Sequence, residues 1–266
     1  MPLHSPNDSR YHVFPIFKPD KLKPDRPTIQ GSAFWVSVGP HNYVVTANHV
    51  LDQTDGSSLY LGNGDMLLIA KADIVRTSNP PCGDYDLDPL DLAVFRLTDQ
   101  QISALRAIGR QPIPITDSAH RPNPIDGLQL VFAGYPATKL RLSFSRKSMS
   151  PQLHTITSQA LTESEIAGHG WDPGLHMLVT FNRSRMTTDS GVRLTAPEPY
   201  GMSGGAVLAP DRITEGTYLL GVGIYYDDQA HYLVGTPIEI AIRMLHDAFP
   251  ETRPFLAGPL TRIRIR

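Results

Sequence analysis

The chain contains, at residues 200–207, the run Tyr-Gly-Met-Ser-Gly-Gly-Ala-Val, and the prediction of its fold starts from this segment. A serine held between glycines and followed by a short apolar stretch suits a nucleophilic hydroxyl on a tight turn. Gly201 lacks a β-carbon, so its N–H can turn toward a substrate oxygen and form a donor pair with the N–H of Ser203. The Gly204 amide would take part if the turn is shifted. The alternative is a glycine-rich turn between two strands, because short motifs also occur by chance.

Two other segments supply the residues that a serine nucleophile needs. Residues 44–50, Val-Val-Thr-Ala-Asn-His-Val, place His49 just after an apolar strand, and residues 90–97, Leu-Asp-Leu-Ala-Val-Phe-Arg-Leu, place Asp91 just before another. Histidine can accept the serine proton because its pKa lies near neutral pH. A carboxylate on its other nitrogen fixes the tautomer. We therefore predict Ser203, His49 and Asp91 as the catalytic residues, with Asp88 as the main competitor of Asp91.

In their order and flanking residues, these three segments resemble the trypsin-like (chymotrypsin-fold, PA clan) serine peptidases. They look closer to the bacterial disulfide-free, HtrA-like branch than to the digestive trypsins. The resemblance implies an all-β fold of two six-stranded antiparallel β-barrels with the cleft between them, so that His49 and Asp91 come from the first barrel and Ser203 from the second. The function it implies is a serine endopeptidase that works through an acyl-enzyme, with an oxyanion hole from the Gly201 and Ser203 amides and without metal or cofactor.

The resemblance also implies the residues of the cleft. The strand after the serine would pair with the substrate backbone, and its side chains would wall the specificity pocket opposite the segment before the serine. Substrate-binding residues are expected at Pro197, Glu198, Tyr200, Val222, Gly223, Ile224 and Tyr225.

Three positions depart from the family pattern. Met202 stands where activatable trypsins carry an aspartate, which argues against activation by the usual ion pair. Ile224 stands where digestive members keep a serine that supports the triad aspartate. Pro197 stands where trypsins hold an acid, so we expect a small or apolar residue, rather than a basic one, in the specificity pocket.

Other functions are weighed against this one. A catalytically latent peptide-binding scaffold could use the same cleft. An α/β-hydrolase esterase would need a buried strand before Ser203 and a helix after it, but 195–199 is rich in proline and the strand after Ser203 stops at Pro210. A cysteine protease built on Cys82 lacks an activating motif, and the histidines show no zinc-binding spacing.

The hydrophobic pattern predicts many short strands and few helices. We expect the first barrel over about 29–115, a linker at 116–127, the second barrel over about 128–235 and a C-terminal helix over about 237–249. Residues 1–28 are expected to form a loosely attached arm in which Val13–Phe17 can pack as a strand. Thr98 and Thr236 each begin a capping-box pattern. Within residues 139–189, strands are expected at Thr155–Leu161 and Met177–Asn182. This stretch does not align with the family pattern and is expected to form loops at the rim of the cleft.

Composition narrows the partners. The net charge of −2 gives no reason to expect a nucleic-acid or membrane surface. The single cysteine excludes an intrachain disulfide, and no signal peptide or membrane-spanning run is recognised, so a cytoplasmic location is expected. The expected partners are a polypeptide substrate and an activating or target protein.

Overall fold

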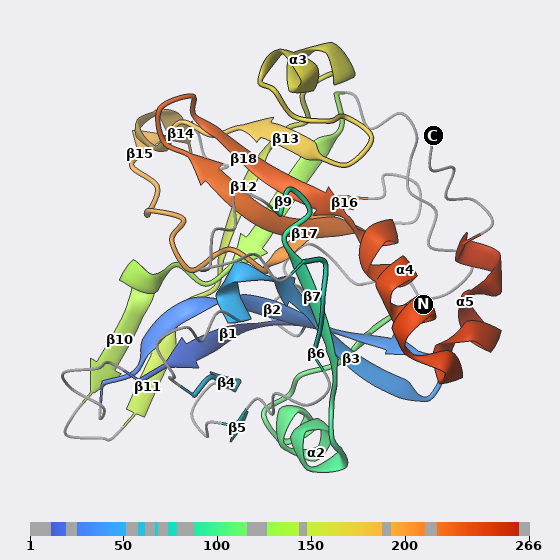
Figure 1. Cartoon of the computed structure of the whole chain (residues 1–266). Coiled ribbons are helices and arrows are strands. Elements are labelled where there is room, and N and C mark those ends of the chain that lie inside the picture. The colour runs from blue at the N-terminus through green and yellow to red at the C-terminus, as the bar shows by residue number, and fades with distance from the viewer. Residues whose placement is uncertain are drawn as a thin grey trace.

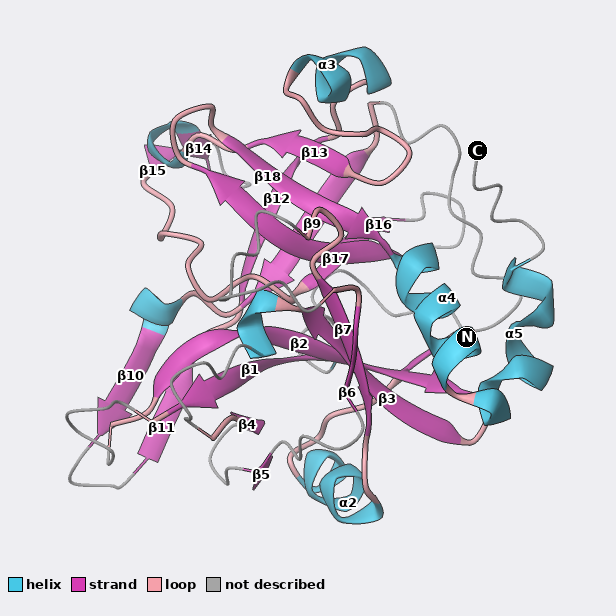
Figure 2. Ribbon diagram, in the orientation of Figure 1, coloured by secondary structure: helices cyan, strands magenta, loops and turns pink. Residues whose placement is uncertain are grey.

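The chain is built mainly from antiparallel strands, with a few helices at the edges (Figures 1 and 2). This computed structural model describes residues 12–19, 26–51, 58–61, 67–68, 74–78, 88–115, 127–143, 148–187, 193–210 and 217–260. Cys82 and most of the expected linker lie outside the described residues. The predicted all-β architecture with a C-terminal helix is confirmed.

Eight strands form the first sheet, in the order β5-β4-β1-β2-β3-β7-β6, with β8 pairing in parallel to β2. Their bounds are β1 Val13–Lys18, β2 Thr28–Val38, β3 His41–Ala47, β4 Tyr60–Leu61, β5 Leu67–Leu68, β6 Ile74–Arg76, β7 Leu92–Arg96 and β8 Ile113–Pro114. Strand β1 pairs with both β2 and β4, so it is an interior strand. The first sheet therefore begins before residue 29, with the apolar run that the sequence marked as a possible strand.

The β2–β3 hairpin forms the centre of this sheet. Phe34 pairs with Val45 across it, and both Phe34 and Trp35 are fully buried although they point to opposite faces. The second face is covered because helix α2 (Asp99–Ala107) places Arg106 over the Trp35 ring, 6.0 Å from its centroid. The capping box predicted at Thr98 begins this helix. Both faces of the hairpin are thus packed, and this packing fixes the position of the end of β3.

Six strands form the second sheet, in the order β12-β9-β16-β17-β18-β13. Their bounds are β9 Gln129–Gly134, β12 His154–Gln159, β13 Met177–Thr180, β16 Ala206–Pro210, β17 Thr217–Asp227 and β18 Tyr232–Pro237. An antiparallel bridge between Ala160 and Val179 joins the two outer strands, and the Leu161 N–H donates to the Leu178 carbonyl at 2.9 Å. The sheet therefore closes on itself as a six-stranded barrel.

The segment 139–189 contains the two strands that the sequence predicts there, together with elements that it does not predict. It contains barrel strands β12 and β13, a hairpin of β10 (Leu140–Ser143) and β11 (Ser148–Pro151), and β14 (Met186–Thr187), which pairs with β15 (Arg193–Leu194). Helix α3 (Glu163–Gly168) begins with a capping box of Thr162 and Glu165, a signal that the sequence carried and that was missed.

The predicted C-terminal helix is α4 (Ile238–Ala248), which packs against both β7 and β17 and so joins the two sheets. Its buried face comprises Ile238, Ala241, Ile242 and Leu245. The capping box predicted at Thr236 is wrong, because Pro237 is the N-cap and the Thr236 hydroxyl donates to the Leu90 carbonyl at 2.8 Å instead. Helix α5 (Arg253–Leu260) follows after a short 3₁₀ turn, Pro250–Thr252. Among the described helices, none has the length and apolar character needed to cross a bilayer.

Candidate active site

The first sheet brings His49 and Asp91 together. His49 begins the 3₁₀ turn His49–Leu51 just after β3, and Asp91 directly precedes β7. Since β3 and β7 are antiparallel neighbours with Ala47 opposite Leu92, the residues just beyond this pair must be adjacent. His49 Nδ1 lies 2.5 Å from Asp91 Oδ2, and the His49 backbone N–H donates to Asp91 Oδ1 at 2.9 Å. A carboxylate only accepts, so Nδ1 carries the proton and Nε2 is the basic nitrogen of the ring.

Asp91 has an unusual backbone conformation and a buried side chain. Its φ is +45°, a left-handed conformation that aspartate tolerates better than most residues. Its side chain is 9% exposed and that of His49 is 31% exposed, so the pair reaches solvent through the histidine. Burial raises the pKa of Asp91 above its usual value of 3.8, and the hydrogen bonds and charge of His49 oppose that rise. The pair is therefore a buried acid beneath a partly exposed base.

The turn that carries Asp91 is tied to the second sheet as well. His176 Nε2 donates to the Pro89 carbonyl at 2.7 Å, and the Thr236 hydroxyl donates to the Leu90 carbonyl. Both donors come from the second half of the chain. They fix the position of the aspartate turn relative to the second barrel.

Ser203 lies on a tight turn that abuts the end of β3. The Met202 N–H donates to the Pro199 carbonyl at 2.8 Å, and the Gly205 N–H donates to the Met202 carbonyl at 2.9 Å. Gly204 has φ +83°, and a β-carbon there would overlap the Ser32 carbonyl and lie 2.9 Å from the Ala47 nitrogen. The turn therefore requires glycine at this position and places Ser203 beside the strand end that leads to His49.

Ser32, a fully buried residue of β2, fastens this turn to the first sheet. Its N–H donates to the Ser203 carbonyl at 2.7 Å, and its hydroxyl donates to the Gly201 carbonyl at 2.7 Å. The same hydroxyl accepts from the Tyr135 N–H at 2.8 Å. A single side chain thus connects the Ser203 turn, β2 and the residue after β9.

The orientation of two backbone amides follows from these contacts. The Tyr200 carbonyl accepts from the Ala137 N–H at 2.7 Å, and the Met202 carbonyl accepts from Gly205. In a trans peptide the N–H points away from the preceding carbonyl, so the N–H groups of Gly201 and Ser203 point away from these acceptors. Within the described part of the chain, neither amide donates a hydrogen bond.

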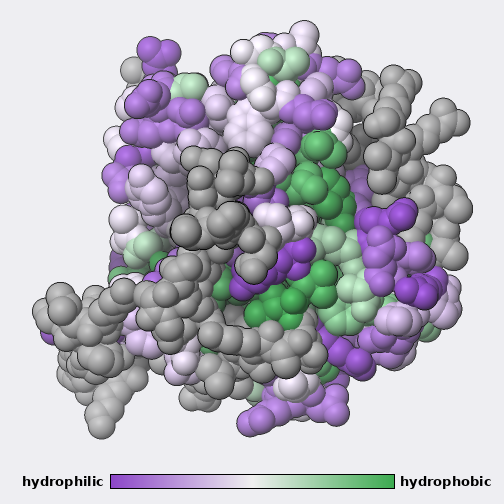
Figure 3. Space-filling view, viewed as in Figure 1, coloured by the Kyte–Doolittle hydropathy of each residue, from purple (hydrophilic) through white to green (hydrophobic). Residues whose placement is uncertain are grey.

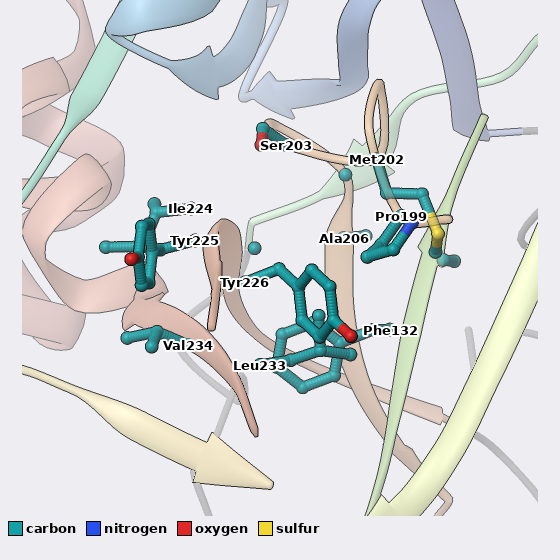
Figure 4. A pocket seen from close by; sticks show the side chains of 13 residues that line it. Phe132, Pro199, Met202, Ser203, Ala206, Ile224, Tyr225, Tyr226, Leu233 and Val234 are labelled. Carbon is teal, nitrogen blue, oxygen red and sulfur yellow. The ribbon is translucent and has the colours of Figure 1, made fainter. Parts of the chain in front are cut away.

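A pocket with about 330 Å³ of empty space, part of it open to solvent, begins at Ser203 (Figure 4). Ile224, Tyr225 and Val234 line one side of it, and Pro199 and Met202 line the other. The side chains of Phe132, Tyr226 and Leu233 gather at the end away from Ser203. Hydrophobic surface also gathers where the two sheets meet beside α4 (Figure 3). Among the residues that the structure describes, no carboxylate or cationic side chain lines the pocket.

Tyr226 has a fixed ring position in this pocket. Its hydroxyl donates to Asp228 Oδ1 at 2.8 Å, and burial together with that acid raises the pKa of Tyr226 to about 12. The phenol is therefore neutral near pH 7, and its ring presents an apolar surface to the pocket.

Comparison with known proteins assigns the family. Residues 31–212, more than half of the chain, match the family model for the trypsin-like peptidase domain. The chain belongs to the trypsin-like peptidases. The match spans all three segments of the candidate site, His49, Asp91 and Ser203.

A solved structure of a thermostable serine protease, AL20, from an extremophilic microorganism is similar at 17% identity, covering 87% of this chain and 93% of that one, with a TM-score of 0.49. No curated protein matches. The nearer likeness to the HtrA branch stays a prediction.

The structure brings some of the predicted cleft residues to this trypsin-like site and leaves others outside the pocket. Gly223, Ile224 and Tyr225 line it together with Ser203. Val222 is fully buried in the core, Tyr200 is 69% exposed, and Glu198 pairs with Arg183 at 3.0 Å. Pro197 and Glu198 are both partly buried, and neither lines the pocket. The sequence does not predict the pocket residues Phe132 on β9 and Leu233 on β18. It also does not predict Ser32, which binds the Ser203 turn to the first sheet.

Within the described residues no group of three or more histidine, cysteine, aspartate or glutamate side chains is placed to hold a metal ion. Asp88, the alternative to Asp91, has its own hydrogen-bond partners, described below, while His49 Nδ1 is bonded to Asp91.

Proposed function

We propose that this trypsin-like peptidase is a serine endopeptidase that works through an acyl-enzyme. Ser203 Oγ attacks the substrate carbonyl carbon while its proton passes to His49 Nε2, and that proton then leaves with the amine product. Water attacks the resulting ester by the same route, returning the proton to Ser203. Asp91 keeps His49 in the required tautomer and stabilises its cationic form.

The observation that carries this proposal is the His49–Asp91 pair, in which both Asp91 oxygens bind the same histidine residue. This geometry makes Nε2 the basic nitrogen of the ring, and the Ser203 turn is packed against the strand end from which His49 follows. The Gly201 and Ser203 amides supply a donor pair for the oxyanion.

Labelling with a fluorophosphonate probe tests the proposal, with wild type compared with Ser203→Ala and His49→Ala. Ser184→Ala is the matched control, because Ser184 is an exposed serine whose hydroxyl binds Asn182, away from the pocket. We expect labelling of wild type and of the control alone, and a fall of about 10⁶-fold in kcat for Ser203→Ala. Equal labelling of Ser203→Ala would refute the assignment. A folded wild type that does not label would favour the latent peptide-binding scaffold.

The pocket supports a preference for a small apolar residue on the acyl side of the cleaved bond. Its described lining offers no charge to a basic or acidic side chain, and Phe132, Tyr226 and Leu233 occupy the end where a long side chain would reach. The substrate backbone would run beside β17, adding a strand at Ile224–Tyr226, beyond the residues that pair with β16 and with the Ser203 turn. Peptide anilides that end in alanine or valine should be cleaved faster than those that end in lysine or phenylalanine. The opposite order would refute this preference.

A further inference from the structure

Asp88 is a buried carboxylate that the proposed chemistry does not use. It is 4% exposed and lies three residues before Asp91. Its Oδ1 accepts from the Asp91 backbone N–H at 3.1 Å. Its Oδ2 accepts from Asn48 Nδ2 at 2.8 Å and from the Thr77 hydroxyl at 2.7 Å. Three donors from three segments of the chain therefore converge on one acid.

Two of these donors come from the proposed catalytic pair or from its sequence neighbour. Asn48 directly precedes His49, and its backbone N–H donates to the Asp91 carbonyl at 2.9 Å. The Asp91 N–H bond closes a turn from Asp88 to Asp91, which supports the left-handed conformation of Asp91. Asp88 thus fixes the backbone on both sides of the His49–Asp91 hydrogen bonds.

The site requires a carboxylate rather than an amide. Arg76 Nη1 donates to Asn48 Oδ1 at 2.6 Å, and arginine has no acceptor, so the Asn48 amide can only turn its Nδ2 toward Asp88. The Asp91 N–H faces the other Asp88 oxygen. The side chain of an asparagine at position 88 has only one oxygen, so it could accept from Asn48 or from the Asp91 N–H, but not from both. Its NH₂ group would face a hydrogen-bond donor at the other position. An isosteric Asp88→Asn change therefore breaks one of the two contacts that reach the catalytic pair.

We propose that Asp88 is a positioning residue of the active site, which holds His49 and Asp91 in their paired geometry through Asn48 and the Asp91 amide. The proposal rests on the proposed function, since it concerns the same histidine and aspartate. It also gives Arg76 a role, because this cation fixes the orientation of Asn48 and also binds the Leu51 carbonyl at 2.9 Å.

The test compares wild type, Asp88→Asn and the exchanged pair, which combines Asp88→Asn with Asn48→Asp. In the exchanged pair, the amide at position 88 can donate to the carboxylate at position 48 and accept from the Asp91 N–H. The carboxylate at position 48 in turn accepts from Arg76, while the Ser78 carbonyl loses the hydrogen bond that Asn48 Nδ2 donates to it at 2.9 Å. Thr98→Ala is the stability control, because it removes the cap of α2 without touching the site. Readouts are the rate of Ser203 labelling, kcat and KM, and the ¹H NMR signal of the His49 Nδ1–H.

We expect Asp88→Asn to lower the labelling rate and kcat about 10–100-fold, the usual size for a residue behind a catalytic group, with KM unchanged. The His49 Nδ1–H signal should shift or broaden, and the exchanged pair should recover at least about tenfold of the loss. If Asp88→Asn does not fold, the exchanged pair decides: labelling within about tenfold of wild type supports the proposal.

A folded Asp88→Asn with wild-type labelling and an unchanged NMR signal would overturn the proposal, as would a folded exchanged pair about 100-fold slower than wild type. A loss in Thr98→Ala equal to that in Asp88→Asn would show a merely structural role. Failure of the proposed function has a different signature, because wild type itself would then not label while the NMR signal would still report on Asp88.

Discussion

Replacing Ser32 with alanine tests whether the first sheet holds the nucleophile turn in its working shape. The Ser32 hydroxyl is fully buried between two partners, the Gly201 carbonyl and the Tyr135 N–H. Alanine removes the hydroxyl and changes little else. Both partners then lose their hydrogen bond inside the protein.

The size of the effect follows from those two groups. A buried polar group left without a partner costs about 1–3 kcal/mol, so the two together cost roughly 2–4 kcal/mol if the turn relaxes partly toward water. For a chain of this size that lowers Tm by roughly 5–15 °C. Release of the Gly201 carbonyl also loosens Gly201, whose own N–H is one of the two proposed oxyanion donors, and complete loss of one such donor costs about 10²–10³ in kcat. We therefore expect kcat to fall about 10–100-fold.

The assay combines thermal unfolding with kcat and KM on a short peptide anilide. Thr252→Val is the matched control, because the Thr252 hydroxyl is also buried and donates to the Leu245 and Phe249 carbonyls at 3.0 and 2.8 Å, beside α4. The control should lose stability and keep kcat. A Ser32→Ala variant that loses stability to the same extent but keeps its kcat within twofold would refute the reasoning.

Further substitutions test other parts of the site. Asp91→Asn should lower kcat about 10⁴-fold by imposing the wrong tautomer on His49. Burial raises the pKa of Asp91 above 3.8. Between pH 3.8 and this raised pKa, the folded state keeps a proton on Asp91 that the unfolded state has lost. The stability that this group contributes is therefore fully present below pH 3.8 and is lost as the pH rises through the raised pKa. The Tm of Asp91→Asn, relative to that of wild type, should therefore rise as the pH increases from below 3.8 to neutral. A Tm difference that does not change with pH would contradict this. Tyr226→Gly should open the far end of the pocket and raise kcat/KM for phenylalanine anilides at least about tenfold relative to alanine anilides; an unchanged ratio would show that Tyr226 does not limit the pocket. Gly204→Ala should displace the turn from Ser32 and abolish labelling, and a folded, fully labelled variant would contradict the fit of this turn.

Local patterns predicted the parts of the fold that local chemistry determines. The apolar runs before His49 and after Asp91 are neighbouring strands, and the Thr98 capping box and the C-terminal helix are present. Thr236 shows where prediction from local sequence fails. Its local pattern is that of a capping box, but its hydroxyl donates to the Leu90 carbonyl in the other half of the chain. A tertiary contact of this kind has no trace in the neighbouring sequence.

The residues of the candidate site also differ in whether the local sequence predicts them. His49, Asp91 and Ser203 are recognisable because their chemistry demands particular residues beside particular strand ends. Phe132 and Leu233 reach the pocket only because β9 and β18 lie in the same closed sheet as β16 and β17, and an apolar residue on a strand looks the same wherever the strand goes. Ser32 and Asp88 have common residue types, and only the groups that they contact distinguish them.

The hydrogen bonds between the two sheets determine where the protein opens first. Three hydrogen bonds cross between the halves within a few residues of the candidate catalytic residues: Ser32 to Ser203, His176 to Pro89 and Thr236 to Leu90. Each sheet has its own strand ladder, although buried residues of both sheets share one core cluster. The cross-links lie outside the ladders, so slight separation of the halves breaks them before it breaks either ladder. In hydrogen–deuterium exchange, the Ser32 amide would exchange earlier than its strand neighbours that pair within β2 and β3. The candidate catalytic residues therefore lie at the interface between the two sheets. Any ligand that binds only when this interface is closed stabilises the whole chain by mass action.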